Sequence, residues 1–370
     1  MGACNGFPDF SRRDKRLNDS SSSFSTTLIS SIKMSLSTTY KAYAFLQAHG
    51  NLQPISIPWK DPQANQVVVK VLACGVCAGD EVVQHQSFPT GLPRIPGHEL
   101  VGDIVAVGPD VRAYKVGDTV GGGWHGGHCF TCTQCISGHF NLCDQQAING
   151  ILRDGGYAEY ATLRTESVVR IPEGMDPAEA APLMCAGVTT FNSLRNMGLK
   201  QGEIVAVQGI GGLGHLGIQF ADKMGYHVVA LSSSPSKRDL ALRLGATDYL
   251  DASQVDQVAE LQKIGGAKVI MCCAPDAKSI SALLGGLTKD GTLLLLAATE
   301  EPLQIPTLPM LNRRLSVRGW PCGTAKDCED TLLFAKRKNV KALVETFPLD
   351  KAQDAYDHRS SARFRAVIVP

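Results

Sequence analysis

The stretch IVAVQGIGGLG, from Ile204 to Gly214, decides the fold of this 370-residue chain. Its apolar first half predicts a buried strand over Ile204 to Gln208. The glycines at 209, 211 and 214 then follow the spacing G-x-G-x-x-G, and a helix is expected from about Gly212 to Met224. A strand, a glycine turn and a helix N-terminus in this order predict a dinucleotide-binding βαβ unit.

Each glycine of this loop has an expected role. Gly209 permits a tight turn, Gly211 lets the backbone approach a pyrophosphate, and Gly214 lets the helix pack on the strand. A glycine-rich turn without a ligand is the alternative, but the complete βαβ context favours a binding loop. The residues expected to contact the cofactor here are Gly209, Gly211, Gly212, Leu213 and Gly214.

Strands and helices continue to alternate after this loop, which predicts an α/β domain with a doubly wound parallel sheet. The expected strands are His227 to Leu231, Val269 to Ala274, Thr292 to Ala298 and Leu315 to Trp320, and the expected helices are Arg238 to Leu244, Ala277 to Leu287 and Asp327 to Lys338. Phe364 to Val369 is expected as a final strand. No solenoid-type repeat interrupts this order.

The residues before the glycine loop predict an all-β region instead, because short β-branched runs alternate with glycine, proline and aspartate. The expected strands are Val67 to Ala73, Leu100 to Val107, Tyr157 to Leu163 and Ser167 to Ile171. Asp176, Pro177 and Glu179 then predict a helix start with a capping box.

The choice of dinucleotide depends on the segment about 20 residues beyond the glycine loop. An NAD site normally has an Asp or Glu there, yet no acid occurs between Asp222 and Asp239. The segment contains Ser232, Ser233 and Lys237, whose hydroxyls and positive charge suit a 2′-phosphate. We therefore expect NADP(H) to be preferred and NAD(H) to remain possible, with a plain polar turn as the alternative interpretation.

Four of the twelve cysteines lie within fifteen residues, at the spacing C-x2-C-x2-C-x7-C. They are Cys129, Cys132, Cys135 and Cys143. Four thiolates on one short lobe can close a tetrahedral zinc shell, so this motif predicts a structural zinc, with an iron–sulfur cluster as the alternative metal group. Other cysteines, at positions 74, 272, 273 and 322, are interpreted as small apolar residues of the hydrophobic core without a chemical role.

Five motifs occur in one order along the chain: Gly75-Val76-Cys77, Pro96-Gly97-His98-Glu99, the four-cysteine lobe, Cys185-Ala186-Gly187-Val188-Thr189 and the glycine loop. In this order they resemble the zinc-containing alcohol dehydrogenases of the medium-chain dehydrogenase/reductase superfamily. The resemblance covers roughly Tyr40 to Pro370. It implies a GroES-like β domain over 36–184 and 325–370 and a Rossmann domain over 185–324.

The resemblance also implies functional roles that spacing alone does not give, since single Cys and His residues are more often part of a core. Cys77, His98 and Cys185 match the ligands of a catalytic zinc, so two zinc ions are expected per subunit. Asp80 matches the residue that orients the histidine, and Glu99 lies beside the ligands. Thr189 matches a residue that contacts the nicotinamide, and Trp124 matches an aromatic residue of the substrate pocket.

One motif departs from the family pattern. The usual Cys-His-Ser/Thr-Asp is here Cys77-Ala78-Gly79-Asp80, which lacks the histidine and the hydroxyl of the usual proton relay. Hydride transfer does not need either side chain. The proton is therefore expected to move by water, a cofactor ribose hydroxyl or another side chain such as His85, and Gly79 is expected to widen the substrate pocket.

The amino-acid composition limits the kinds of molecule that this protein can bind. Lys and Arg number 36 and Asp and Glu number 35, so the basic excess that nucleic acids and anionic membranes require is absent. We expect a small alcohol or carbonyl substrate, a homodimer or homotetramer, a cytoplasmic location and a disordered N-terminal tail over residues 1–35. The alternative functions are a zinc-independent quinone or enoyl reductase of the same fold and a non-catalytic NADP-binding protein.

Overall fold

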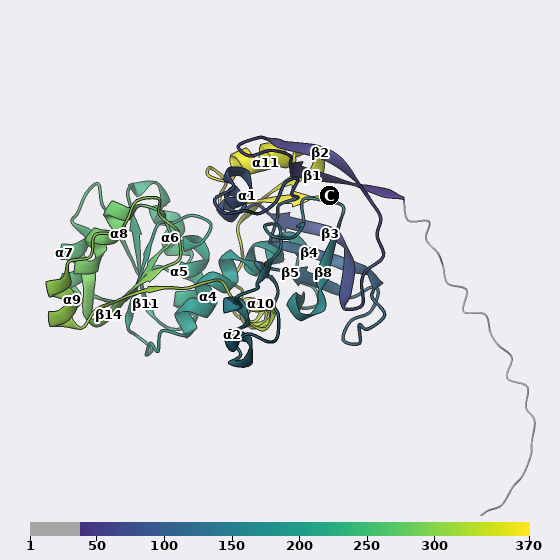
Figure 1. The fold of residues 1–370 in the computed structure, drawn as a ribbon. Helices are drawn as coiled ribbons and strands as arrows, with labels where there is room; N and C mark the ends of the chain where they lie inside the picture. Colours follow the sequence, from purple (N-terminus) through teal and green to yellow (C-terminus); the bar gives the residue numbers. More distant parts are fainter. Residues whose placement is uncertain (1–37) are drawn as a thin grey trace, which may run out of the picture. The chain divides into compact units, whose positions relative to one another are not determined.

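The computed structural model describes residues 38–370, so the predicted tail over residues 1–35 lies outside the described part. The described chain is α/β and contains one wholly parallel sheet and one mainly antiparallel sheet (Figure 1). This architecture confirms the predicted fold class. Within residues 38–370, no helix has the length and apolar character needed to cross a membrane.

The parallel sheet has the strand order β12-β11-β10-β13-β14-β15. Its strands are β10 (Ile204–Gln208), β11 (His227–Ser232), β12 (Asp248–Asp251), β13 (Ala267–Cys272), β14 (Leu287–Leu295) and β15 (Ser316–Gly319). β10 is the first strand of this sheet in sequence. The chain adds β11 and β12 on one side of β10 and then returns to add β13, β14 and β15 on the other. Doubly wound sheets bind ligands at such a switch point.

Helices connect these strands and cover both faces of the sheet. They are α5 (Gly214–Lys223), α6 (Arg238–Arg243), α7 (Gln257–Lys263), α8 (Ala277–Leu283) and α9 (Thr307–Arg313). Successive residues of β10 point to opposite faces, so Val205 and Val207 lie in one apolar cluster and Ala206 lies in the other. Burial on both faces explains why these strands are continuously apolar in sequence.

The antiparallel sheet has the order β16-β17-β3-β4-β5-β9, with β8 also paired to β3. Its strands are β3 (Gln66–Gly75), β4 (Leu100–Val107), β5 (Thr119–Gly122), β8 (Tyr160–Arg164), β9 (Val168–Arg170), β16 (Val344–Pro348) and β17 (Arg365–Val369). The last strand, β17, pairs with the end of β3, where Val367 lies opposite Gly75. This pairing brings the C-terminal residues next to the segment that contains Cys77.

The described chain has further strands and α-helices outside these two sheets and the helices of the parallel one. The strands are β1 (Thr39–Phe45) with β2 (Leu52–Pro58), and β6 (His125–Gly127) with β7 (Ala147–Ile148). The helices are α1 (Glu81–His85), α2 (Thr133–Ile136), α3 (Pro177–Ala180), α4 (Ala186–Arg195), α10 (Ala325–Lys338) and α11 (Ala352–His358). The predicted domain boundaries at 184/185 and 324/325 stay predictions.

Several sequence-based boundaries were wrong. The helix predicted to reach Leu287 ends at Leu283, and β14 begins at Leu287 instead of Thr292, because Gly285 and Gly286 favour a break there. The strands and helices β12, α7, β16 and α11 were not predicted. β12 and β16 are short and contain charged residues, so their sequences do not indicate strands. Pairing with β11 and β17 stabilises their extended conformation.

The predicted capping box at α3 is half correct. The Asp176 carboxylate accepts hydrogen bonds from the backbone N–H groups of Ala178 and Glu179, as an N-cap residue does. The Glu179 carboxylate instead lies 3.2 Å from the Lys341 ammonium. Glu179 therefore links α3 to the segment before β16.

Candidate functional site

Three predicted ligands and one acid meet at a single point in the described chain. Cys77 follows β3, His98 and Glu99 precede β4, and Cys185 precedes α4. One ligand atom from each of these four residues lies within 4.8 Å of the others. The fold thus brings together residues that are separated by up to 108 positions in sequence (185 − 77).

His98 is held in one orientation by a buried hydrogen-bond network. Its Nδ1 lies 3.0 Å from the Asp80 Oδ1, which also accepts from the backbone N–H of Gly97. The Tyr157 hydroxyl donates to the Asp80 Oδ2 at 2.8 Å. With Nδ1–H directed to Asp80, the lone pair of Nε2 points away from the carboxylate.

The Nε2 atom of His98 is buried and takes part in no aligned hydrogen bond among the described residues. A buried polar atom without an aligned hydrogen bond is costly, and this one lies beside two cysteine sulfurs. An imidazole nitrogen with two thiolates is a donor set that zinc prefers. The residues present therefore fit a metal ion at this point.

The thiols of Cys77 and Cys185 shift each other's pKa. A hydrogen bond from Cys185 strongly lowers the pKa of the Cys77 thiol, and the charges of Arg365 and His98 lower that pKa further. The hydrogen bonds of Cys185 with Cys322 and Cys77 raise the pKa of the Cys185 thiol. The protein alone therefore favours a thiolate at Cys77, and a divalent cation would favour a thiolate at Cys185 as well.

Glu99 is fully buried next to these ligands and faces Arg365. Burial is the largest influence on its carboxyl and, against the opposing charge of Arg365, raises the pKa of Glu99 to about 8. The Arg365 Nη2 lies 3.1 Å from the Glu99 Oε1, although neither oxygen of Glu99 accepts an aligned hydrogen bond among the described residues. Arg365 Nη1 donates to the backbone oxygen of Val76 at 3.2 Å.

Arg365 also lies against the glycine loop. A Cβ placed on Gly212 would lie 3.2 Å from the Arg365 guanidinium carbon, so one arginine contacts both the metal centre and the loop. The sequence interpretation missed this residue. The sequence shows only that Arg365 is the one charged residue of the otherwise apolar strand β17, and its exposure of 8% is known from the structure alone.

The glycine loop has the geometry that its sequence predicts. Gly209 has φ +84°, and a Cβ there would lie 2.5 Å from the Ala274 Cβ. A Cβ on Gly214 would lie 1.9 Å from the Gly209 oxygen, which explains the close packing of α5 on the loop. A Cβ on Gly211 would meet nothing within 4 Å, so this side of the loop is open to a ligand. The loop therefore fits a dinucleotide.

The other predicted cofactor residues surround the same loop. The Lys237 ammonium donates to the backbone oxygen of Ile210 at 2.7 Å, which holds its charge over the loop. Ser232 ends β11, and Ser233 follows it with an exposed side chain. Leu213 precedes α5 and packs partly against an apolar cluster, so its expected cofactor contact is through the backbone.

Gly79 and Trp124 lie directly at the metal centre. The Trp124 ring stands perpendicular to the His98 ring, with the ring centres 4.9 Å apart. A Cβ on Gly79 would lie 3.0 Å from the His98 Cε1 and 3.1 Å from the Trp124 Cζ3. The missing side chain at position 79 therefore leaves space that is bounded by a metal-ligand candidate and an aromatic ring.

The structure also shows the surroundings of Thr189, Cys322 and His85. Thr189 is buried on α4, and its hydroxyl contacts the Cys322 thiol, which in turn contacts Cys185. Cys322 does pack against the core, as predicted, but it also belongs to the surroundings of the metal centre. His85 is exposed on α1 and stacks on His49, with ring centres 5.4 Å apart, so the structure gives no support to His85 as a proton carrier.

We expect a Gly79→Ser substitution to select against bulky substrates. The serine Cβ and hydroxyl must displace Trp124 or occupy the space between Trp124 and His98, so turnover of a branched or aromatic carbonyl falls about tenfold or more relative to acetaldehyde. The check is kcat/KM for both substrates. An unchanged ratio would show that position 79 does not limit the pocket.

The four-cysteine lobe forms a second donor cluster, with its four sulfurs within 4.8 Å of one another. Backbone N–H groups point at the sulfurs: those of Thr131 and Cys132 donate to the Cys129 Sγ, and those of Cys129 and Gln145 donate to the Cys143 Sγ. The hydroxyl of Thr131 is the largest influence that lowers the pKa of the Cys129 thiol to about 6. These donors favour a thiolate at Cys129, whereas burial and the neighbouring cysteines raise the pKa of the Cys135 thiol to about 12, so a cation in the cluster would favour its thiolate form.

Two family models match the chain. The description of one is "Alcohol dehydrogenase GroES-like domain", over residues 63–173, and that of the other is "Zinc-binding dehydrogenase", over residues 212–337. The chain is 45% identical to the alcohol dehydrogenase notN of Aspergillus sp. (strain MF297-2), and the match covers 90% of this chain and 99% of that protein.

Solved structures agree with these matches. A cinnamyl alcohol dehydrogenase from Sorghum bicolor has a TM-score of 0.83 at 32% identity, covering 90% of this chain and 97% of that one. A putative zinc-binding dehydrogenase from Sinorhizobium meliloti 1021, bound to NADP, has a TM-score of 0.82 at 28% identity, covering 90% and 100%. The chain therefore belongs to the zinc-type alcohol dehydrogenase family of the medium-chain dehydrogenase/reductase superfamily.

Proposed function

We propose that this protein is a zinc-dependent oxidoreductase that interconverts an alcohol with an aldehyde or ketone by hydride transfer, with NADP(H) preferred over NAD(H). The observation that carries the proposal is the buried Nε2 of His98, which takes part in no aligned hydrogen bond among the described residues, beside the sulfurs of Cys77 and Cys185. Glu99 belongs to the same cluster and pairs with Arg365, and Arg365 also contacts the glycine loop. Arg365 thus connects the candidate zinc site with the dinucleotide-binding loop.

We propose two zinc ions per chain. Cys77, His98 and Cys185 hold a catalytic ion, and the four-cysteine lobe holds a structural one. Two thiolates and a neutral imidazole balance the charge of Zn²⁺, so the catalytic ion stays electrophilic. When bound, the zinc polarises the oxygen of the substrate and the nicotinamide gives or accepts the hydride.

The chain's own residues orient the reacting groups. Asp80 fixes the tautomer of His98, and Tyr157 and the backbone N–H of Gly97 in turn hold Asp80. Ala78 and Gly79 carry no group that can hold a proton, so the proton of the alcohol leaves by water or by a ribose hydroxyl of the cofactor. Trp124 forms an apolar wall beside His98 for the carbon skeleton of the substrate.

The preference for NADP(H) rests on the residues after β11. Ser233 is exposed, Lys237 lies over the glycine loop, and no acid stands between Asp222 and Asp239. The NADP bound by the Sinorhizobium meliloti relative supports the same choice. Hydroxyls and a cation stabilise a 2′-phosphate, whereas a carboxylate would repel it.

We expect Ser233→Asp to reverse the cofactor preference. The new carboxylate repels the 2′-phosphate and can accept a hydrogen bond from a ribose 2′-hydroxyl, so KM for NADPH rises about tenfold or more while KM for NADH falls. Ser236→Asp, placed three residues further on, is the matched control. If both substitutions changed KM for NADPH and for NADH equally, residue 233 would not contact the 2′ group of the cofactor ribose.

The experiment that tests the proposed reaction follows the loss of reduced-nicotinamide absorbance with a panel of carbonyl compounds. The panel contains aliphatic, cyclic and aromatic aldehydes and ketones, together with a quinone and an enone, and each is run with NADPH and with NADH. Turnover of aldehydes or ketones to alcohols with NADPH is the expected result. Turnover of the quinone or enone alone, or of no compound despite NADPH binding, would contradict the proposal.

The domains, the oligomeric state and the location of the protein are proposed from its resemblance to the family. We propose a catalytic domain over 36–184 and 325–370, a Rossmann domain over 185–324, a homodimer or homotetramer, and a cytoplasmic location. Support for self-association comes from α9, the helix before the edge strand β15, where Leu308 and Leu311 are 66% and 77% exposed. Such exposed leucines are typical of a surface that a second chain covers.

A further inference from the structure

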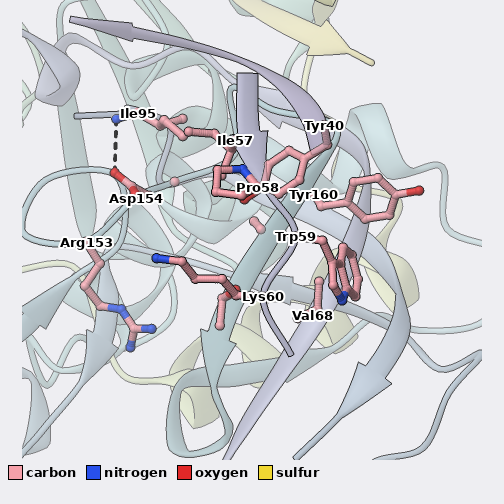
Figure 2. Close-up of a pocket in the computed structure, with 13 residues that line it drawn as sticks. Tyr40, Ile57, Pro58, Trp59, Lys60, Val68, Ile95, Arg153, Asp154 and Tyr160 are labelled. Atoms are coloured by element: carbon pink, nitrogen blue, oxygen red, sulfur yellow. Dashed lines mark hydrogen bonds between the residues drawn. The ribbon is translucent and has the colours of Figure 1, made fainter. Parts of the chain in front are cut away.

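A second cavity, of about 210 Å³, lies apart from the metal centre and the glycine loop (Figure 2). Tyr40 and Trp59, from the hairpin β1–β2 and the segment after it, form part of its wall. Tyr160 of β8 and the loop residues Lys60, Arg153 and Asp154 complete the polar and aromatic lining. None of the residues assigned above to zinc or dinucleotide binding lines this cavity.

One side of the cavity is a preformed aromatic wall. The rings of Tyr40 and Trp59 each meet the Tyr160 ring edge to face, with ring centres 5.5 Å apart in both pairs. The indole N–H of Trp59 donates to the Asp61 carboxylate at 3.0 Å, which further restrains the ring. In the view of Figure 2 these three rings lie on the right of the cavity. A flat apolar ligand can contact them without reordering them.

The opposite side carries two cations, Lys60 and Arg153, on the left and below the centre in Figure 2. Within residues 38–370 neither forms an ion pair, and Arg153 donates to a neutral group, the backbone oxygen of Gly126, at 3.3 Å. Burial lowers the pKa of the Arg153 guanidinium, because part of its hydration is lost. An anion in the cavity would restore a partner to this desolvated charge.

The carboxylate of Asp154 lines the cavity but is not the anionic partner of Arg153. Its Oδ1 lies 3.0 Å from the Arg94 Nη1 and accepts the backbone N–H of Ile95 at 3.2 Å, so its charge is already paired. The Asp154 and Ile95 contact is the dashed line in Figure 2. The cavity therefore keeps an excess of positive charge beside its aromatic wall.

We propose that this cavity binds a small carboxylic acid with a single flat, apolar ring. The carboxylate lies between Lys60 and Arg153, and the ring lies against Trp59 and Tyr160. The volume is below the 300 Å³ at which pockets for drug-sized ligands begin, so about one ring fits. The site is independent of the proposed hydride transfer, because it shares no residue with the metal centre.

The test is isothermal titration of the full-length, zinc-loaded protein with benzoate and with benzamide, its neutral counterpart. We expect benzoate to bind and benzamide to bind at least about tenfold more weakly. Lys60→Met and Arg153→Met are each expected to weaken benzoate binding about tenfold. Lys289→Met removes the same charge from an exposed position outside the cavity and is expected to leave binding unchanged.

Lys60→Met is the decisive variant, since Lys60 is exposed and its loss removes no contact of the fold. The kcat/KM for carbonyl reduction is expected to be the same in Lys60→Met as in the parent protein. No benzoate binding, equal binding of benzamide, or undiminished benzoate binding in both cavity variants would overturn the proposal. The last outcome would place the benzoate elsewhere, for example at the metal centre.

Discussion

Replacing Cys185 with serine is expected to lower kcat/KM for carbonyl reduction at least about a thousandfold and to remove one of two zinc ions per chain. A thousandfold loss corresponds to about 4 kcal/mol of transition-state stabilisation, which a Lewis acid at the reacting oxygen typically supplies. The fold itself should persist, because Cys185 is not part of an apolar cluster and serine is nearly isosteric. Zinc content by mass spectrometry and steady-state kinetics are the two measurements.

The matched control for this substitution is Cys272→Ala. Cys272 is fully buried in the core of the parallel sheet, away from both donor clusters, so its truncation costs some stability but no zinc. Full zinc content and normal kcat are therefore expected in Cys272→Ala. A Cys185→Ser protein that keeps two zinc ions and its activity would show that the ligand assignment is wrong.

Replacing Cys143 with serine is expected to remove the other zinc ion and to lower Tm by about 5 °C or more. The lobe cannot form a core of its own, since Phe130, Ile136 and Leu142 are 56%, 76% and 48% exposed. With so little buried apolar area, metal–thiolate bonds are the main source of its local stability. A change of this size in Tm corresponds to roughly 4 kcal/mol for a 370-residue protein, because the entropy of unfolding grows with chain length.

Limited proteolysis distinguishes local loss of the lobe from global unfolding. The first cleavage of Cys143→Ser is expected within 129–143, while the catalytic zinc is retained. Ser137→Ala, an exposed position on the same lobe, is the control and should keep both ions and its resistance to cleavage. An unchanged zinc content in Cys143→Ser would contradict the proposed structural site.

The local geometry around the candidate site could be predicted from sequence. The stretch from Ile204 to Gly214 spans eleven residues and the helix α5 spans ten, so the strand, turn and helix N-terminus are fixed by neighbouring side chains. The same holds for the four-cysteine lobe, whose donors all lie between Cys129 and Cys143. In such segments spacing alone determines which atoms can meet.

The parts that sequence missed depend on long-range pairing. Arg365 reaches Glu99 and Val76 because β17 pairs with β3, a contact between positions nearly 300 residues apart that no local pattern encodes. Tyr157 binds Asp80 across 77 positions for a similar reason. The trio of Cys77, His98 and Cys185 was predicted from resemblance, since no spacing rule connects ligands on three separate segments.

The measurement that tests the central claim most directly is NADPH-dependent reduction of an aromatic aldehyde before and after removal of zinc. The enzyme is treated with a chelator until the metal bound at the centre of Cys77, His98 and Cys185 is lost, and zinc is then restored. We predict that activity falls with the metal content and returns when zinc is added. Full activity in protein shown to contain no metal at this centre would contradict the account.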